Sequence, residues 1–148
     1  MIENTPSPLA VSQAMLADDR ASQSQGFVLV DVSGSSAVLS VVVREDMVNG
    51  LGICHGGIIF MFADSAMAFA TNATNHVAVA ASASIDFVAP ARLGDTLTAT
   101  AIIQWSGGRT GLTEVEVVAQ TPTEPGARTV AFFHGRTQRT GGQIIPTR

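Results

Sequence analysis

One carboxylate stands in an otherwise apolar stretch of the chain. Residues 57–73 read GIIFMFADSAMAFATNA, contain no proline and carry a single charged residue, Asp64. This composition predicts a helix of about four to five turns that is apolar nearly all round and therefore largely buried. Burying a lone carboxylate costs several kcal/mol unless it is paired or protonated. Asp64 is therefore either a structural residue bonded to Ser65 or to backbone donors, or a functional residue.

Two glycines stand at the start of this helix. Gly56 and Gly57 follow Cys54 and His55, so free backbone N–H groups are expected at the helix N-terminus, where the helix dipole favours a negatively charged oxygen. Glycine also lets a ligand approach the backbone closely. An acyl carbonyl such as that of a thioester becomes an oxyanion when it is attacked, and N–H donors stabilise that oxygen. The alternative is that the glycines only form the turn into the helix.

The spacing of the two features has a consequence for assembly. Asp64 follows Gly56 by eight residues, which is roughly 12 Å along one helix. Both groups cannot reach one carbonyl carbon from the same helix. If they serve one site, the carboxylate must come from a second subunit whose helix runs antiparallel, as a two-fold dimer provides twice.

The composition agrees with a subunit interface. The 148 residues are 46% hydrophobic and only 14% charged, whereas about 25% charged residues are usual. So few charges leave little to cover the surface of a monomer. A net charge of −4 argues against nucleic-acid binding.

Neither a metal site nor a membrane segment is expected. The single cysteine, Cys54, excludes an internal disulfide, and the three histidines show no metal-ligand spacing. The first ten residues lack the pattern of a signal peptide, and the helix at 57–73 is too short and too polar to span a membrane. These features predict a cytoplasmic protein without a cofactor.

The remaining pattern is mostly β. A helix is expected at 8–20, a loop at 44–52, and strands at 27–32, 37–43, 76–88, 95–105, 110–120 and 128–139. In the strand at 95–105, alternation predicts one buried face formed by Leu97, Ala99, Ala101, Ile103 and Trp105. The order predicts an α+β fold, a mostly antiparallel sheet packed on one apolar helix. We expect one domain over 1–148, with an ordered core at about 26–140 and loose ends at 1–6 and 140–148.

Five short motifs together resemble a known family. They resemble the hotdog-fold acyl-CoA thioesterases of phenylacetic-acid degradation, and the resemblance covers roughly residues 26–140. The pattern Asn-x5-His-Gly-Gly-x7-Asp is its most specific part. The motifs are Asn49–Gly57, Asp64-Ser65, Ser84–Pro90, Gly94–Leu97 and Gly108–Gly111.

The resemblance implies a fold and a catalytic arrangement. An antiparallel sheet of five or six strands would wrap around the long helix, and subunits would pair into homodimers and usually homotetramers. The Gly56 N–H would bind the thioester carbonyl, and Asp64 of the partner subunit would act as general base or nucleophile. Asn49 would orient the water or the carbonyl. His55 would support the loop by hydrogen bonding or contact the thioester.

The resemblance also implies acyl-CoA as the substrate, with phenylacetyl, hydroxyphenylacetyl or medium-chain acyl groups. Arg92 and Arg109 are the best candidates to bind the phosphates of coenzyme A, because arginine forks suit phosphate. Arg136 and Arg139 come next, and a solvated surface arginine is the alternative for each. The other residues predicted to bind substrate are Gly57, Ser65, Phe87 and Thr110.

Two other functions compete with hydrolysis. A hotdog hydratase or dehydratase would pair a histidine with an acid, but the helix carries no Asp-x4-His pair. A non-catalytic module that binds acyl-CoA is expected to lack the helix carboxylate, which is present here as Asp64.

Overall fold

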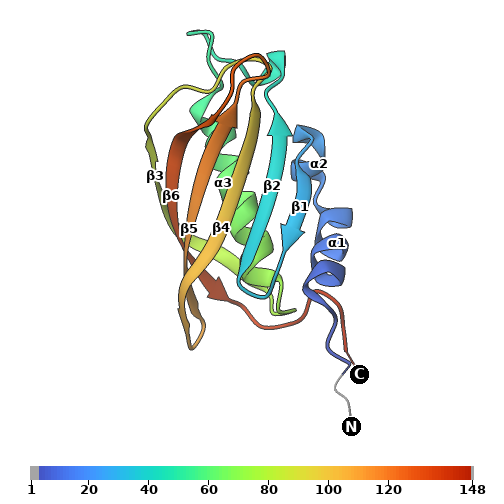
Figure 1. The fold of residues 1–148 in the computed structure, drawn as a ribbon. Helices are drawn as coiled ribbons and strands as arrows, with labels where there is room; N and C mark the ends of the chain where they lie inside the picture. Colours follow the sequence, from blue (N-terminus) through green and yellow to red (C-terminus); the bar gives the residue numbers. More distant parts are fainter. Residues whose placement is uncertain (1–3, 148) are drawn as a thin grey trace.

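A computed structural model describes residues 4–147, and within them six strands form one antiparallel sheet around a long helix (Figure 1). The strand order is β1-β2-β4-β5-β6-β3. This arrangement confirms the predicted α+β hotdog fold. The helices are α1 (Pro8–Asp18), α2 (Arg20–Gln25), the short 3-10 helix η1 (Glu45–Met47) and α3 (Gly56–Asn72), and the strands are β1 (Val28–Val32), β2 (Ser36–Val42), β3 (Ala78–Phe87), β4 (Thr96–Gly107), β5 (Thr110–Gln120) and β6 (Ala127–Arg139).

Helix α3 forms the centre of the core, as its apolar sequence predicts. Phe62, Met67 and Phe69 are almost completely buried and pack against the concave face of the sheet. The packing leaves no room for a side chain at Gly135 of β6, because a Cβ added there would overlap the sulfur of Met67. Close packing of this kind holds α3, and therefore Asp64, at a defined depth on the sheet.

The alternation predicted for β4 is right over most of the strand and wrong at its end. Leu97, Ala99 and Ala101 are buried against α3, but the Trp105 side chain is 54% exposed. The pairing of β4 with β5 shifts by one residue between Ile103 and Trp105. Such a bulge reverses the direction of the following side chains, so Trp105 points to the outer face of the sheet.

The predicted helix at 8–20 is two helices that meet at Asp19. Pro8 occupies the first turn of α1, and the Ser7 hydroxyl accepts a hydrogen bond from the Ala10 N–H. Asp19 ends α1 and caps α2, because its carboxylate accepts hydrogen bonds from the N–H and hydroxyl of Ser22. An aspartate that competes for backbone donors in this way breaks a helix.

The end of the chain is attached to the fold rather than loose. The Thr140 N–H donates to the Val77 carbonyl at 3.0 Å, and the Val77 N–H donates to the Gly142 carbonyl at 3.2 Å. The Asn75 side chain binds the backbone of Ile145 further along. The prediction of a loose C-terminal end is therefore wrong for residues 140–147, and residue 148 lies outside the described residues. Of the predicted loose N-terminal end, 1–6, residues 1–3 lie outside the described residues as well.

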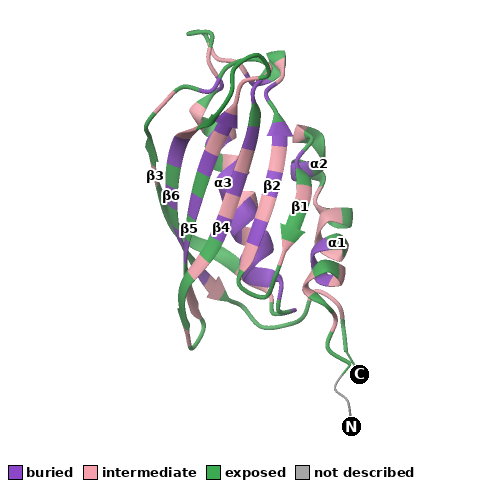
Figure 2. Ribbon diagram, viewed as in Figure 1, coloured by how far each residue is buried: buried purple, intermediate pink, exposed green. Residues whose placement is uncertain are grey.

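The two edges of the sheet differ. Helices α1 and α2 lie beside β1 at one edge (Figure 1), whereas most residues of β3 at the other edge are exposed (Figure 2). An exposed edge strand carries unpaired backbone groups that can pair with another strand. Within residues 4–147, no helix is long and apolar enough to cross a membrane.

Candidate active site

The loop before α3 is organised by Asn49. Its side-chain oxygen accepts hydrogen bonds from the Leu51 N–H at 2.9 Å and the Ile53 N–H at 3.3 Å. Gly52 adopts a φ of 77°, which closes the turn and which glycine tolerates best. Asn49 thus shapes the loop through its oxygen, and its NH2 group is the part that can face a ligand.

His55 caps α3 and leaves one backbone donor available. Its Nδ1 accepts a hydrogen bond from the Gly57 N–H at 2.8 Å, so His55 holds the loop and Gly57 is not a free donor. Within the described chain, the Gly56 N–H has no protein acceptor. The helix N-terminus therefore presents the Gly56 N–H to an incoming oxygen.

Phe87 lies directly against Gly56. A Cβ added at Gly56 would be 3.1 Å from the Phe87 ring, so any larger residue there would displace the ring or cover the donor. Phe87 is the last residue of β3 and is 52% exposed. Its ring is available to contact a ligand that reaches the Gly56 N–H.

Asp64 is half-buried on α3, and burial raises the pKa of its carboxyl. Its carboxylate makes no hydrogen bond and no ion pair with any group in residues 4–147. The Ser65 hydroxyl instead bonds the hydroxyl of Ser22 on α2 at 3.1 Å. The structural alternative, an Asp64 bonded to Ser65, is therefore absent, and Ser65 faces the N-terminal helices.

Desolvation without a partner makes Asp64 a stronger base than an exposed aspartate. Asp64 also lines a cavity of about 310 Å³. Asp64 and Gly56 both lie on α3, eight residues apart, so the predicted separation of roughly 12 Å holds within one protomer. One protomer therefore cannot direct both groups at the same carbonyl.

The arginines predicted to bind phosphate lie at opposite ends of the sheet. Arg92 is in the loop before β4, near the start of α3, whereas Arg109 and Thr110 are at the β4–β5 turn (Figure 1). Both arginine side chains are exposed. Arg109, Thr110 and Arg139 line a separate cavity of about 320 Å³. One coenzyme A cannot contact Arg92 and Arg109 of the same protomer, because β4 separates them by about 36 Å.

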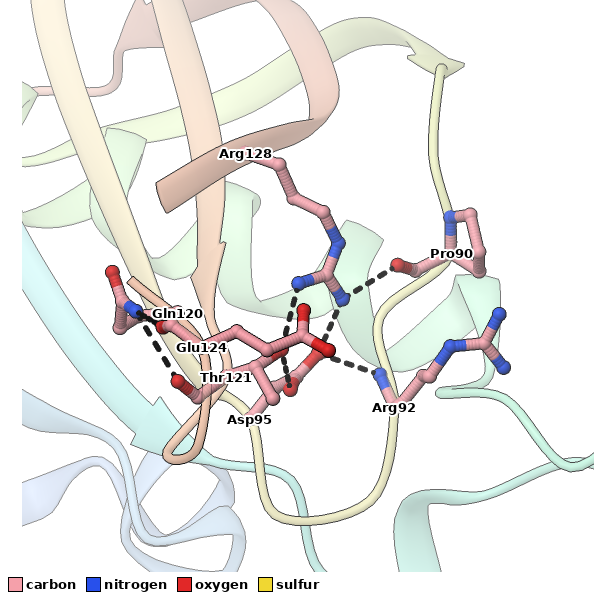
Figure 3. A network of polar contacts seen from close by, with 7 residues as sticks. All are labelled: Pro90, Arg92, Asp95, Gln120, Thr121, Glu124 and Arg128. Atoms are coloured by element: carbon pink, nitrogen blue, oxygen red, sulfur yellow. Dashed lines mark hydrogen bonds and ion pairs between the residues drawn. The ribbon is translucent and has the colours of Figure 1, made fainter. Parts of the chain in front are cut away.

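Sequence reasoning missed a polar network behind the Arg92 loop (Figure 3). The Asp95 carboxylate, 1% exposed, forms an ion pair with Arg128 at 2.5 Å and accepts hydrogen bonds from the Arg92 N–H and the Thr121 hydroxyl, both at 2.9 Å. Burial raises the pKa of Asp95, but these three donors together hold it below its ordinary value. The motif Gly94-Asp95 is the part of the sequence that could have indicated this network. Its partner Arg128 is distant in the sequence, so the ion pair could not be predicted.

This network supports the loop that carries Gly56. Arg128 also donates to the Pro90 carbonyl at 3.0 Å, and the next residue, Ala91, accepts a hydrogen bond from the Cys54 N–H at 2.8 Å. Cys54 is buried beside Asp95, and desolvation raises the pKa of its thiol to about 11. Cys54 is therefore a packing residue of the loop rather than a nucleophile.

The Asp95–Arg128 pair gives stability that depends on pH. Because the pKa of folded Asp95 is lowered, its contribution is fully present above the unfolded pKa of about 3.9 and is lost as pH falls through the folded pKa. We expect Arg128→Ala to reduce the free energy of unfolding at pH 7 by about 2–4 kcal/mol. Urea titrations should show that this loss shrinks as the pH is lowered from 4 toward 2. A loss that is the same at every pH, or an equal loss in the exposed control Arg20→Ala, would contradict the assignment.

Comparison with known proteins identifies the family of this chain. Residues 51–125 match the model of the thioesterase superfamily. The chain is 38% identical to the acyl-coenzyme A thioesterase PaaI of Escherichia coli (strain K12) over 133 residues, which cover 90% of this chain and 91% of that relative. The solved structure of the E. coli PaaI protein from the phenylacetic acid degradation operon has a TM-score of 0.86 at 37% identity, over 92% of this chain and 95% of that chain.

A more distant solved structure also matches. The protein smu.793 from Streptococcus mutans UA159, solved bound to acetyl CoA, has a TM-score of 0.72 at 26% identity, over 79% of this chain and 90% of that chain. The chain therefore belongs to the thioesterase superfamily, which confirms both the predicted hotdog family and the predicted class of enzyme, a thioester hydrolase.

Proposed function

We propose that this protein hydrolyses acyl-CoA to the free acid and coenzyme A, with phenylacetyl, hydroxyphenylacetyl or medium-chain acyl groups as substrates. The observation that carries the proposal is the state of Asp64. This residue lines a cavity, burial raises the pKa of its carboxyl, and the carboxylate has no hydrogen-bond or ion-pair partner in residues 4–147. The similarity to E. coli PaaI, named an acyl-coenzyme A thioesterase, and to a protein that binds acetyl CoA supports the substrate class. Membership of the thioesterase superfamily favours hydrolysis over hydration or binding alone.

The proposed chemistry uses two groups of this chain. The Gly56 N–H donates to the thioester carbonyl oxygen and stabilises the oxyanion that forms on attack. As a general base, Asp64 takes a proton from water, the water oxygen bonds to the carbonyl carbon, and the C–S bond breaks. The proton then passes from Asp64 to the departing thiolate. Asn49 positions the water or the carbonyl through its NH2 group.

Asp64 can instead act as a nucleophile. Its oxygen then bonds to the carbonyl carbon, the thiolate leaves, and water cleaves the resulting anhydride. Rapid quenching followed by mass spectrometry separates the two routes, since an acyl group attached to Asp64 appears only in the second.

The site requires two protomers in this proposal. Gly56 and Asp64 lie eight residues apart on α3, and the exposed strand β3 leaves the sheet edge open to a second copy. A two-fold homodimer that joins the sheets at β3 brings each Asp64 toward the Gly56 end of the partner helix. We expect dimers that pair further into homotetramers. Light scattering in solution measures the assembly, and a monomer that is fully active would overturn the shared site.

A panel of acyl-CoA substrates tests the proposed activity. Release of the coenzyme A thiol is followed with phenylacetyl-CoA, hydroxyphenylacetyl-CoA and saturated acyl-CoAs of increasing length. We expect turnover on at least one aryl or medium-chain substrate. Rates at background level across the whole panel would overturn the proposal.

The phosphate-binding arginines are tested by their effect on KM. Arg92 lies at the Gly56 end of its own protomer, whereas Arg109 can approach that coenzyme A only from another protomer. We expect loss of a phosphate contact in Arg92→Ala or Arg109→Ala to raise KM about tenfold with little change in kcat. Hydrolysis of a short thioester without the nucleotide should be unaffected.

An equal loss on both substrates would show that these arginines act through the fold. The matched control is Arg20→Ala, which removes an exposed arginine from α2 and should leave both KM values unchanged.

A further inference from the structure

The cavity beside Asp64 is lined in part by residues from helix α1 and from the C-terminal segment. Its inner walls belong to α3 and to the first residues of β3. Thr137 of β6 adds to these walls, and Met15 of α1 and Ile144 of the C-terminal segment complete the lining. Met15 and Ile144 lie outside residues 51–125, the part that matches the superfamily model. The parts of the lining formed by Met15 and Ile144 therefore come from segments outside the matched region.

The C-terminal wall is held in place by an unusual residue. Asn75 follows α3 with a φ of 67° and is 3% exposed. Its side-chain NH2 donates to the Ile145 carbonyl at 2.8 Å, and its side-chain oxygen accepts from the Ile145 N–H at 2.8 Å. A left-handed conformation is uncommon for a residue other than glycine and persists where the surroundings enforce it. This pair of bonds fixes Ile144, the neighbour of Ile145, against the cavity.

The chemistry of the lining suits an apolar group. Met15, Val77, Val79 and Ile144 contribute hydrocarbon. The polar groups of the lining are partly used elsewhere, since the Thr71 hydroxyl donates to the Met67 carbonyl at 3.0 Å. The cavity has a volume of about 310 Å³, which leaves room for an acyl group.

We propose that Ile144 and Met15 set the size of the acyl group that this protein accepts, with Asn75 as the residue that holds Ile144 in position. The inference rests on the proposed function. Asp64 must lie beside the carbonyl carbon it acts on, so the acyl group bonded to that carbon begins at Asp64 and extends into the adjoining cavity. Each methylene of the acyl chain that is buried there contributes about 0.8 kcal/mol to binding. A chain that is too long for the cavity collides with Ile144.

Substitution of Ile144 tests this inference against a close control. Ile144→Ala enlarges the cavity, and Ile144→Trp fills it. Ile145→Ala removes the same atoms one residue along the same segment, but Ile145 lines a different cavity, together with Thr74 and His76. Asn75→Gly keeps the positive φ at no steric cost and removes both bonds to the segment.

The measurement is kcat/KM over saturated acyl-CoAs from two to twelve carbons and phenylacetyl-CoA. We expect Ile144→Ala and Asn75→Gly to raise the ratio of long-chain to short-chain kcat/KM about tenfold. Ile144→Trp should lower kcat/KM for phenylacetyl-CoA while acetyl-CoA is little affected. Unchanged ratios in both Ile144 variants, or an equal change in Ile145→Ala, would overturn the inference.

A binding measurement separates this inference from the proposed hydrolysis. Alkyl-CoA thioethers of the same lengths lack the carbonyl and cannot be hydrolysed. If the protein hydrolyses no acyl-CoA, the proposed function fails, and calorimetry with the thioethers still decides the role of Ile144. We expect the longest thioether that binds to be longer for Ile144→Ala than for the wild type. The same length limit in both proteins would reject the inference.

Discussion

Asp64→Asn is expected to lower kcat by a factor of about 100 or more while the fold is preserved. The amide has nearly the same shape as the carboxylate but cannot accept a proton from water or form the acyl intermediate. Because burial raises the pKa of Asp64, the folded state disfavours its charged form at neutral pH. The asparagine variant should therefore unfold at the same temperature as the wild type or a higher one.

The pH dependence of the wild type gives an independent measurement. The reactive form of Asp64 is the carboxylate, so kcat/KM should fall as pH decreases through its pKa. Since that pKa is raised, the fall should begin at a higher pH than for an exposed aspartate of pKa about 3.9. Asp31→Asn, at an exposed aspartate of β1, is the control and should keep full activity. Most of the wild-type turnover surviving in Asp64→Asn would show that the role assigned to Asp64 is wrong.

Mixing two inactive variants should restore activity if the site is shared. Asp64→Ala lacks the carboxylate. Gly56→Val adds a branched side chain at a position where even a Cβ would lie only 3.1 Å from the Phe87 ring, so the carbonyl cannot approach the N–H. A mixed dimer then contains one site with both defects and one site with neither. It should therefore recover at most about half of the wild-type activity per dimer.

The mixing experiment needs a verified mixed dimer and a control for the glycine change. Co-expression with two different affinity tags isolates the mixed species. Gly50→Val alters another glycine of the same loop, which has a negative φ and open space around it, and should retain activity by itself. A verified mixed dimer without recovered activity would contradict the proposal that the active site is shared between protomers.

The central helix and its carboxylate were predictable because their signals are local. Residues 57–70 are apolar on every side apart from Asp64 and Ser65, and a helix that is apolar all round is buried in a core. The glycine pair before it likewise indicated a helix N-terminus, and the structure begins α3 at Gly56. The distance between Gly56 and Asp64 follows from helix geometry alone.

Other features were wrong or missed because they depend on partners far along the chain. The exposure of Trp105 results from a bulge in its pairing with β5, and alternation in a single strand contains no information on a neighbour's register. Asp95 and Arg128 are distant in the sequence, yet the fold places their charges 2.5 Å apart.

The sequence by itself determined which residues can carry the chemistry, because residue type, helical period and capping act over a few neighbouring positions. Tertiary structure alone decided what surrounds them. It placed Phe87 against Gly56, separated Arg92 from Arg109, and attached the C-terminal segment through Asn75. Those contacts form only when strands and terminal segments that are distant in sequence pack on α3. They are stabilised by apolar burial and hydrogen bonding across the whole fold.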